Sequence, residues 1–128
     1  MTSEEKRALR KPGMTGLVRL WSALQWSIAG FRSAWRHEEA FRLEVVAGVV
    51  LVPLALWLGG SGLERAMLLG SVFLVLIVEL LNSSVESVVD RISPEEHVLS
   101  KRAKDLGSAA VLLGLANVLV IWLLVLLG

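Results

Sequence analysis

How this chain can fold is limited most strongly by three long apolar runs, at residues 43–58, 63–89 and 106–127. A transmembrane helix needs about 20 mostly apolar residues to cross a hydrocarbon core of about 30 Å, so the second and third runs are long enough. The first run is shorter, but Phe41 and Trp57 can extend it into the membrane interfaces. The runs predict an all-α membrane protein with three transmembrane helices. The predicted spans lie at about residues 42–59, 64–90 and 105–127.

The amino-acid composition points the same way. Hydrophobic residues make up 55% of the chain, and its mean hydropathy is +0.66, whereas apolar residues including glycine make up about 45–50% of soluble domains. The chain has no cysteine, which excludes a disulfide framework and a thiolate metal site. Residues 1–13 are polar and end at a Pro-Gly pair, so we expect a mobile tail there and a single domain over residues 14–128.

Residues 15–36 show a pattern that is typical of an amphipathic helix. Apolar side chains recur every three or four positions, whereas Arg19 and Arg32 lie on other faces. Tryptophans on the apolar face and arginines on the polar face suit a helix that lies in the plane of the lipid headgroups. A helix packed on a soluble core is the alternative, although this chain offers little soluble core.

The placement of basic residues predicts the orientation in the membrane. Of the 13 basic residues, eight precede Leu43 and four lie between residues 91 and 105, while Arg65 alone adjoins the glycine-rich turn at residues 59–62. Loops rich in lysine and arginine stay on the cytoplasmic side. We therefore expect the N-terminus and the loop at residues 91–105 in the cytoplasm, with the glycine-rich turn and the C-terminus outside.

The second span carries polar residues that a bilayer resists. At about 100° per helical residue, Glu79, Glu86 and Asp90 fall within roughly 40° of one another. Asn82 lies about 60° to one side, and the polar stripe so formed extends about 16 Å along the helix axis. Each ionisable group at such depth costs about 2.5–3.5 kcal/mol, so it usually has a partner or a function. Because three short spans enclose little, burial of this stripe calls for neighbouring copies of the chain.

The expected topology gathers more ionisable residues at the cytoplasmic ends of the spans. Several carboxylates there, without cysteine and with only two histidines in the chain, suit Mg²⁺ better than zinc or copper. Mg²⁺ held by one or two carboxylates, water and phosphate is usual at a phosphoryl-transfer centre. Glu79 lies about two helical turns deeper than Glu86, where it could act as a general base toward a hydroxyl at the interface. The gathered residues are Glu38, Glu44, Glu86, Asp90, Lys104 and Asp105.

Structural interpretations of the same residues stay open at this point. Glu79 can be a hydrogen-bonding group between helices, with Asn82 as its partner. Glutamates at a membrane edge, taken singly, are most often solvated charges. The small residues at 107–110 and Gly114 favour close helix packing, which is their usual role in membrane spans.

Three sequence blocks carry a family resemblance. The first is Glu-Leu-Leu-Asn-Ser-Ser-Val-Glu from Glu79, followed by Val-Asp-Arg at residues 89–91. The second is Leu-Ser-Lys-Arg-Ala-Lys-Asp-Leu-Gly-Ser-Ala-Ala-Val at residues 99–111, and the third is Ala-Trp-Arg-His-Glu-Glu-Ala-Phe-Arg-Leu-Glu at residues 34–44. In these blocks, and in their spacing over about residues 15–127, the chain resembles the small prokaryotic integral-membrane diacylglycerol kinases.

The resemblance implies an activity and an architecture. Members of this family transfer the γ-phosphoryl group of Mg-ATP to the hydroxyl of diacylglycerol, which gives phosphatidic acid. They are homotrimers of the bacterial inner membrane, with three transmembrane helices and an N-terminal surface helix in each subunit. The expected partners are therefore ATP, a membrane lipid and further copies of the chain, with Mg²⁺ as cofactor and no nucleic acid.

The resemblance also implies roles for individual residues. It makes Glu79 the catalytic base, supported by Asn82 and Asp90, with Glu38 and Glu86 as metal ligands. Trp26 stands where an aromatic phenol can occur in the family, and Pro53 in the first span is a second departure. The implied nucleotide contacts are Arg19, Trp26, Glu38, Glu86, Glu95, Glu96, Lys104 and Asp105. The implied lipid-site residues are Arg19, Ala34, Trp35, Glu44, Glu79 and Ser108.

Other functions remain to be separated from this one. Undecaprenol kinase is a sibling that shares the Glu-x-x-Asn-x-x-x-Glu pattern and phosphorylates a polyprenyl alcohol, although the blocks at residues 35–44 and 95–111 favour diacylglycerol. A small proton- or cation-coupled transporter would use Glu79 without consuming ATP. In a non-enzymatic assembly subunit, the polar stripe would only hold helices together.

Overall fold

The computed structural model describes residues 2–5, 15–92 and 97–128 of the chain. In these ranges the regular secondary structure is helical, without strands, which confirms the all-α class. The chain divides into two compact units, Met1–Ser33 and Ala34–Gly128. Most of the predicted tail, together with Glu95 and Glu96, lies outside the described residues.

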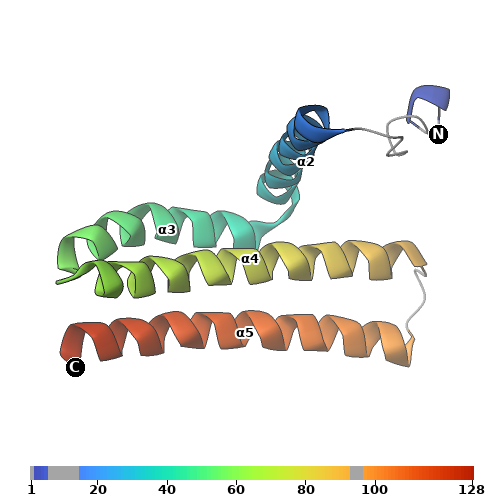
Figure 1. The fold of residues 1–128 in the computed structure, drawn as a ribbon. Helices are drawn as coiled ribbons and strands as arrows, with labels where there is room; N and C mark the ends of the chain where they lie inside the picture. Colours follow the sequence, from blue (N-terminus) through green and yellow to red (C-terminus); the bar gives the residue numbers. More distant parts are fainter. Residues whose placement is uncertain (1, 6–14, 93–96) are drawn as a thin grey trace. The chain divides into compact units, whose positions relative to one another are not determined.

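Helix α2 (Gly16–His37) covers the region in which an amphipathic helix is expected (Figure 1). The large apolar side chains along it are exposed. At its C-terminal end, Nη1 of Arg42 donates hydrogen bonds to the backbone oxygens of Trp35 at 2.8 Å and Arg36 at 3.3 Å. A cation is favourable there because the last carbonyl groups of a helix lack partners and carry the negative end of its dipole. The placement of this helix on a membrane surface stays a prediction.

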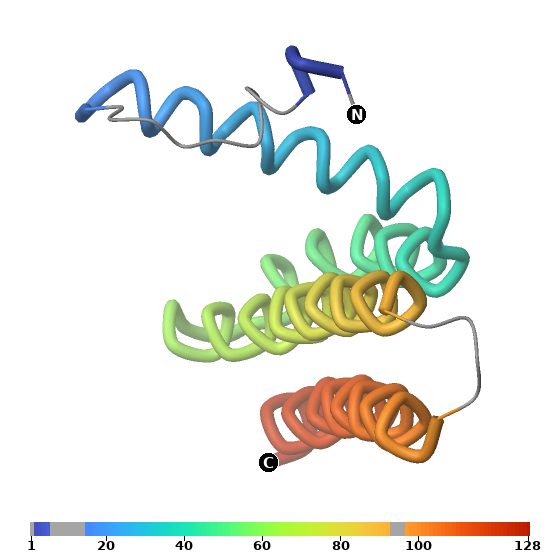
Figure 2. The backbone as a smooth tube through the Cα atoms, turned by 90° about the vertical axis from the view of Figure 1, so that its right-hand side faces the viewer, coloured from blue at the N-terminus to red at the C-terminus, as the bar shows by residue number. Residues whose placement is uncertain are grey.

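Helices α3 (Glu39–Leu58), α4 (Gly62–Ile92) and α5 (Val98–Leu127) make up most of the second unit. Each is long and apolar enough to cross a membrane, as the three apolar runs predict. Helix α4 packs against both α3 and α5, and successive helices run antiparallel (Figure 1, Figure 2). The start of α3, the end of α4 and the start of α5 therefore lie at one end of the bundle. Helix α3 continues through Pro53.

Helix α5 begins well before the apolar span expected from about residue 105. Its cap is His97, whose Nδ1 accepts a hydrogen bond from the backbone nitrogen of Leu99 at 3.0 Å. One turn later, Nζ of Lys101 lies 2.6 Å from Oδ2 of Asp105, an ion pair with the i, i+4 spacing of helices. The residues before position 105 are polar, so hydropathy leaves them out of the span. Polar residues can still continue a helix, and α5 therefore begins earlier than the apolar run.

The connection between α3 and α4 is closed by reciprocal side-chain caps. Oγ of Ser61 accepts a hydrogen bond from the nitrogen of Glu64 at 3.1 Å, and Oε2 of Glu64 accepts one from the nitrogen of Gly60 at 2.5 Å. This arrangement resembles a capping box and satisfies donors at the start of α4. At the end of α3, Nε of Arg65 donates to the oxygen of Leu56 at 3.1 Å.

The interior of the bundle is small and mostly aliphatic. Its buried apolar side chains include Phe41, Leu68, Val72 and Val75, of which Leu68 is 0% exposed. Large apolar side chains cover the outer faces of the three helices as well. An apolar exterior of this extent is stable only against lipid or other apolar protein surface.

One polar link joins α4 to α5 within this apolar interior. Nε1 of Trp122 donates a hydrogen bond to Oγ of Ser71 at 3.1 Å. Oγ of Ser71 in turn donates to the backbone oxygen of Leu68 at 2.7 Å. Because lipid offers these groups no alternative partner, such a link favours one register between the two helices.

Candidate active site

Two carboxyl groups form the centre of the candidate site, between α3 and α4. Glu79 of α4 is only 4% exposed, and the carboxyl group of Glu44 on α3 lies close enough to interact with it directly. Oε2 of Glu44 is buried and has no hydrogen-bond partner in the described part of the chain. Two carboxylates this close repel each other unless they share a proton or a cation neutralises them. The Glu44–Glu79 pair is thus suited to handling a proton or a positive charge.

Two more carboxylates lie near Glu79. The charges of Glu38, which precedes α3, and of Glu86, two turns along α4, both act on Glu79. Each of these two side chains is partly buried. Of the acidic residues that the sequence places at this end of the bundle, the structure therefore brings Glu38, Glu44 and Glu86 near Glu79. Asp90 and Asp105 form ion pairs with lysines instead.

The described side chains do not by themselves form a complete metal-binding site. In the described ranges, no group of three or more His, Asp or Glu side chains lies close enough to hold one. Mg²⁺ needs only one or two carboxylates when water and phosphate oxygens complete its shell. Glu38 and Glu86 offer such hard oxygen donors near Glu79. The donor set fits a magnesium ion that arrives with a phosphate ligand.

Asn82 has a different partner from the one considered in the sequence. Its Nδ2 donates a hydrogen bond to Oε1 of Glu86 at 3.4 Å, so the hypothesis of an Asn82–Glu79 hydrogen bond is wrong in this structure. Both pairings are possible on a helix, because Asn82 lies three positions from one glutamate and four from the other. Oδ1 of Asn82 is buried without a partner in the described residues.

An ion pair links α4 to α5 at the same end of the bundle. Nζ of Lys104 lies 2.6 Å from Oδ1 of Asp90. Both side chains are about half exposed or more, so the pair contributes little to stability. Sequence reasoning assigned the two residues to the site separately and missed their contact, because their separation in sequence gives no signal for it.

The other implied site residues are distributed more widely. Arg19 and Trp26 belong to the first compact unit, whereas the carboxylates of the candidate site belong to the second. Ala34 is buried, whereas Trp35 on α2 and Ser108 on α5 are exposed.

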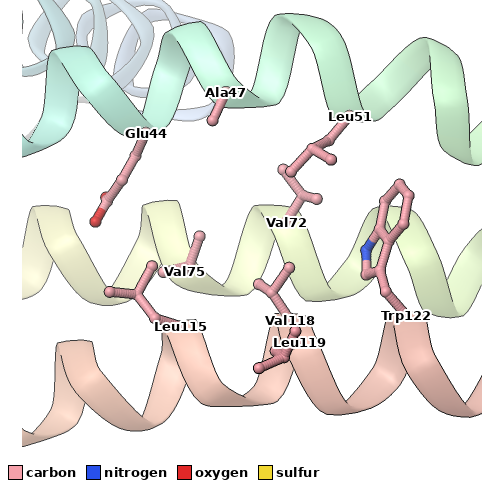
Figure 3. Close-up of a pocket in the computed structure, with 9 residues that line it drawn as sticks. All are labelled: Glu44, Ala47, Leu51, Val72, Val75, Leu115, Val118, Leu119 and Trp122. Atoms are coloured by element: carbon pink, nitrogen blue, oxygen red, sulfur yellow. The ribbon is translucent and has the colours of Figure 1, made fainter.

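An apolar cavity begins beside Glu44 and extends along α4 between α3 and α5 (Figure 3). Its volume is about 310 Å³, and apart from Glu44 and Trp122 its lining is aliphatic. Sequence reasoning did not find this cavity, because it depends on how three helices pack and not on any spacing within one of them. The lining residues are Glu44, Ala47, Leu51, Val72, Val75, Leu115, Val118, Leu119 and Trp122.

These features define a small helical membrane protein with an acidic site beside an apolar cavity. Residues 25–126 of the chain match the family model for prokaryotic diacylglycerol kinase. The diacylglycerol kinase of Pseudomonas aeruginosa is 51% identical over 116 residues, which cover 91% of this chain and 94% of that protein. The chain therefore belongs to the prokaryotic diacylglycerol kinase family, as its three sequence blocks predict, and it is a kinase.

Further relatives bear the same name. The diacylglycerol kinase of Escherichia coli is 48% identical over 112 residues, which cover 88% of this chain and 92% of that protein. That of Haemophilus influenzae is 46% identical over 108 residues, which cover 84% of this chain and 92% of that protein. The similarity thus extends well beyond the short blocks, over nearly the whole of each relative.

Proposed function

We propose that the protein transfers the γ-phosphoryl group of ATP to the hydroxyl group of diacylglycerol, which yields phosphatidic acid and ADP. The observation that carries this proposal is the buried carboxyl group of Glu79 beside Glu44, at the end of the bundle where Glu86 also lies. Relatives named diacylglycerol kinase support diacylglycerol as the acceptor. Undecaprenol, a polyprenyl alcohol, is the alternative acceptor.

The proposed reaction needs one base and a fixed arrangement of charges. The hydroxyl oxygen of the lipid bonds to the γ-phosphorus, and the bond from that phosphorus to the bridging oxygen breaks. ADP leaves with the electron pair, while the carboxylate of Glu79 accepts the hydroxyl proton. Phosphoryl transfer depends mainly on positioning and electrostatic stabilisation, so a few side chains on three helices suffice.

Glu38 and Glu86 are the proposed carboxylates for Mg²⁺, with Asn82 holding Glu86 through its amide. When bound with ATP, the ion would neutralise charge on the transferred group. Asp90 would support the site through its ion pair with Lys104. The further proposed nucleotide contacts are Arg19, Trp26, Glu95, Glu96, Lys104 and Asp105.

The apolar cavity supports a lipid substrate that enters from the bilayer. A hydrocarbon chain can lie along its aliphatic walls, while the polar end of the molecule stays near Glu44. In this arrangement the hydroxyl group is presented to the Glu44–Glu79 pair. Ala34, Trp35 and Ser108 are further proposed contacts of the lipid.

The proposed setting is a homotrimer in the bacterial inner membrane, with α2 on its cytoplasmic surface. Apolar outer faces on all three long helices support both lipid and subunit contacts. If sites form between subunits, mixed trimers of Glu79→Gln and Glu86→Gln chains should regain activity that neither variant has alone. Mixed trimers without any activity would indicate that each site is built within one chain.

A lipid panel tests the substrate. Purified protein in detergent is incubated with radiolabelled ATP, Mg²⁺ and either diacylglycerol or undecaprenol. We expect labelled phosphatidic acid, and we expect chelation of Mg²⁺ to abolish it. Labelling of the polyprenol alone would overturn the assignment of diacylglycerol, and no labelling of either lipid would overturn lipid kinase activity.

A further inference from the structure

Gly107 on α5 lies so close to Asn82 on α4 that it leaves no room for a side chain. A Cβ atom added there would overlap Oδ1 of Asn82 on α4 and would lie 3.0 Å from its Cγ. Oδ1 of Asn82 is buried and accepts no hydrogen bond from any described residue. The amide of Asn82 therefore lies against the bare backbone of α5.

The other end of that amide points to the candidate active site. Nδ2 of Asn82 donates to Oε1 of Glu86 at 3.4 Å. The amide group is planar and carries both atoms, so Oδ1 cannot leave its place without moving Nδ2. A side chain at residue 107 would thus turn Asn82 away from Glu86.

We propose that Gly107 is a positioning residue for phosphoryl transfer, because the space it leaves lets Asn82 direct its amide at Glu86. The proposal rests on the proposed role of Glu86 in holding Mg-ATP. Close helix packing alone is the competing explanation for a glycine in a span. Gly114 allows the two to be compared, since it also faces α4 and a Cβ there would meet Cγ2 of Val75 at an ordinary 3.4 Å.

A double-mutant cycle tests the proposal. Gly107→Ala, Asn82→Ala and the double variant are compared in their affinity for Mn²⁺·ATP by electron paramagnetic resonance, with Mn²⁺ as the probe for Mg²⁺. Gly107→Ala should weaken binding about tenfold in the wild-type background, and less than about twofold once Asn82→Ala has vacated the space. The matched control, Gly114→Ala, should change the affinity less than about twofold.

Two results would overturn the proposal: an equal loss of affinity in both backgrounds, or no loss in the wild-type background. If Gly107→Ala lowers the yield of folded protein, the double variant decides. Recovery of folding with the affinity of Asn82→Ala alone supports the proposal, whereas continued misfolding refutes it.

The Glu86→Gln variant distinguishes a failure of the proposed role of Glu86 from a failure of the inference about Gly107. If this variant binds Mn²⁺·ATP as tightly as the wild type does, the proposed role of Glu86 and the inference both fail. If it binds more weakly while Gly107→Ala binds normally, only the inference about Gly107 fails.

Discussion

Glu44 has surroundings that cost stability, and the proposed mechanism gives this residue a role in the chemistry. One of its oxygens is buried without a partner in the described residues, and its carboxyl group faces Glu79. A buried unsatisfied polar group costs about 1–3 kcal/mol. Such costs persist mainly where a function depends on them, because activity and stability often conflict.

Glu44→Gln should therefore make the protein more stable and less active. The new amide can donate a hydrogen bond to Glu79 and removes the repulsion between two carboxylates, which should raise the free energy of unfolding by about 1 kcal/mol. Turnover should fall at least about tenfold, because the charge of the Glu44–Glu79 pair changes. Unfolding in mixed micelles and the rate of lipid phosphorylation measure the two effects.

Glu39→Gln is the matched control for this variant. Glu39 is an exposed glutamate in the first turn of the same helix, so both quantities should stay close to those of the wild type. A Glu44→Gln protein that is less stable but fully active would show that Glu44 has a structural role only.

Helical spacing predicts the polar stripe of the second span but not its partners. Glu79 and Glu86 follow from periodicity alone, since residues on one face of a helix recur at known intervals. Two features required the structure. The contact of Glu79 with Glu44 depends on how α3 packs against α4. The hydrogen bond of Asn82 lies within α4, where spacing alone allows either Glu79 or Glu86 as its partner.

At the scale of helices, the apolar runs predict the three helices that are apolar enough to cross a membrane. Hydropathy does not reveal the polar links between these helices. The hydrogen bond from Trp122 to Ser71 joins residues 51 positions apart in sequence. A serine and a tryptophan in apolar runs carry no signal that they meet. The early start of α5 was also missed, because its cap at His97 precedes the apolar residues.

Trp122→Phe should lower stability modestly by removing this link between α4 and α5. Hydrogen bonds between membrane helices contribute about 0.6 kcal/mol on average and at most about 1.7 kcal/mol, so a loss in this range is expected. Unfolding in detergent measures it. Trp57→Phe is the control, because Trp57 is 78% exposed; equal losses in the two variants would exclude a specific role for the Ser71 link.

At the scale of the whole molecule, the antiparallel arrangement of α3, α4 and α5 brings the start of α3, the end of α4 and the start of α5 to one end of the bundle. These helix ends carry the acidic residues of the candidate site. This arrangement follows from three spans joined by short connections, so the sequence predicts it once the spans are known. The apolar cavity beside Glu44 does not follow in the same way, because its volume depends on how side chains from three helices fill the space.

Single cysteines test the proposed orientation, and the chain is convenient for this because it has no cysteine of its own. Ser61→Cys lies in the connection from α3 to α4, and Ser100→Cys lies near the start of α5. In intact cells, a membrane-impermeant thiol reagent should label only the first. Labelling of only the second would reverse the orientation and place the acidic end outside.

The most direct test of the account is the turnover of Glu79→Gln in the folded, assembled protein. This change keeps the size of the buried side chain but removes the proposed base, whose contribution is typically about 10²–10⁴-fold. We expect phosphorylation of diacylglycerol to fall by at least about 10²-fold, while oligomeric state and melting temperature stay near those of the wild type. A folded Glu79→Gln protein with wild-type turnover would contradict the role of Glu79 as base, and with it the proposed mechanism.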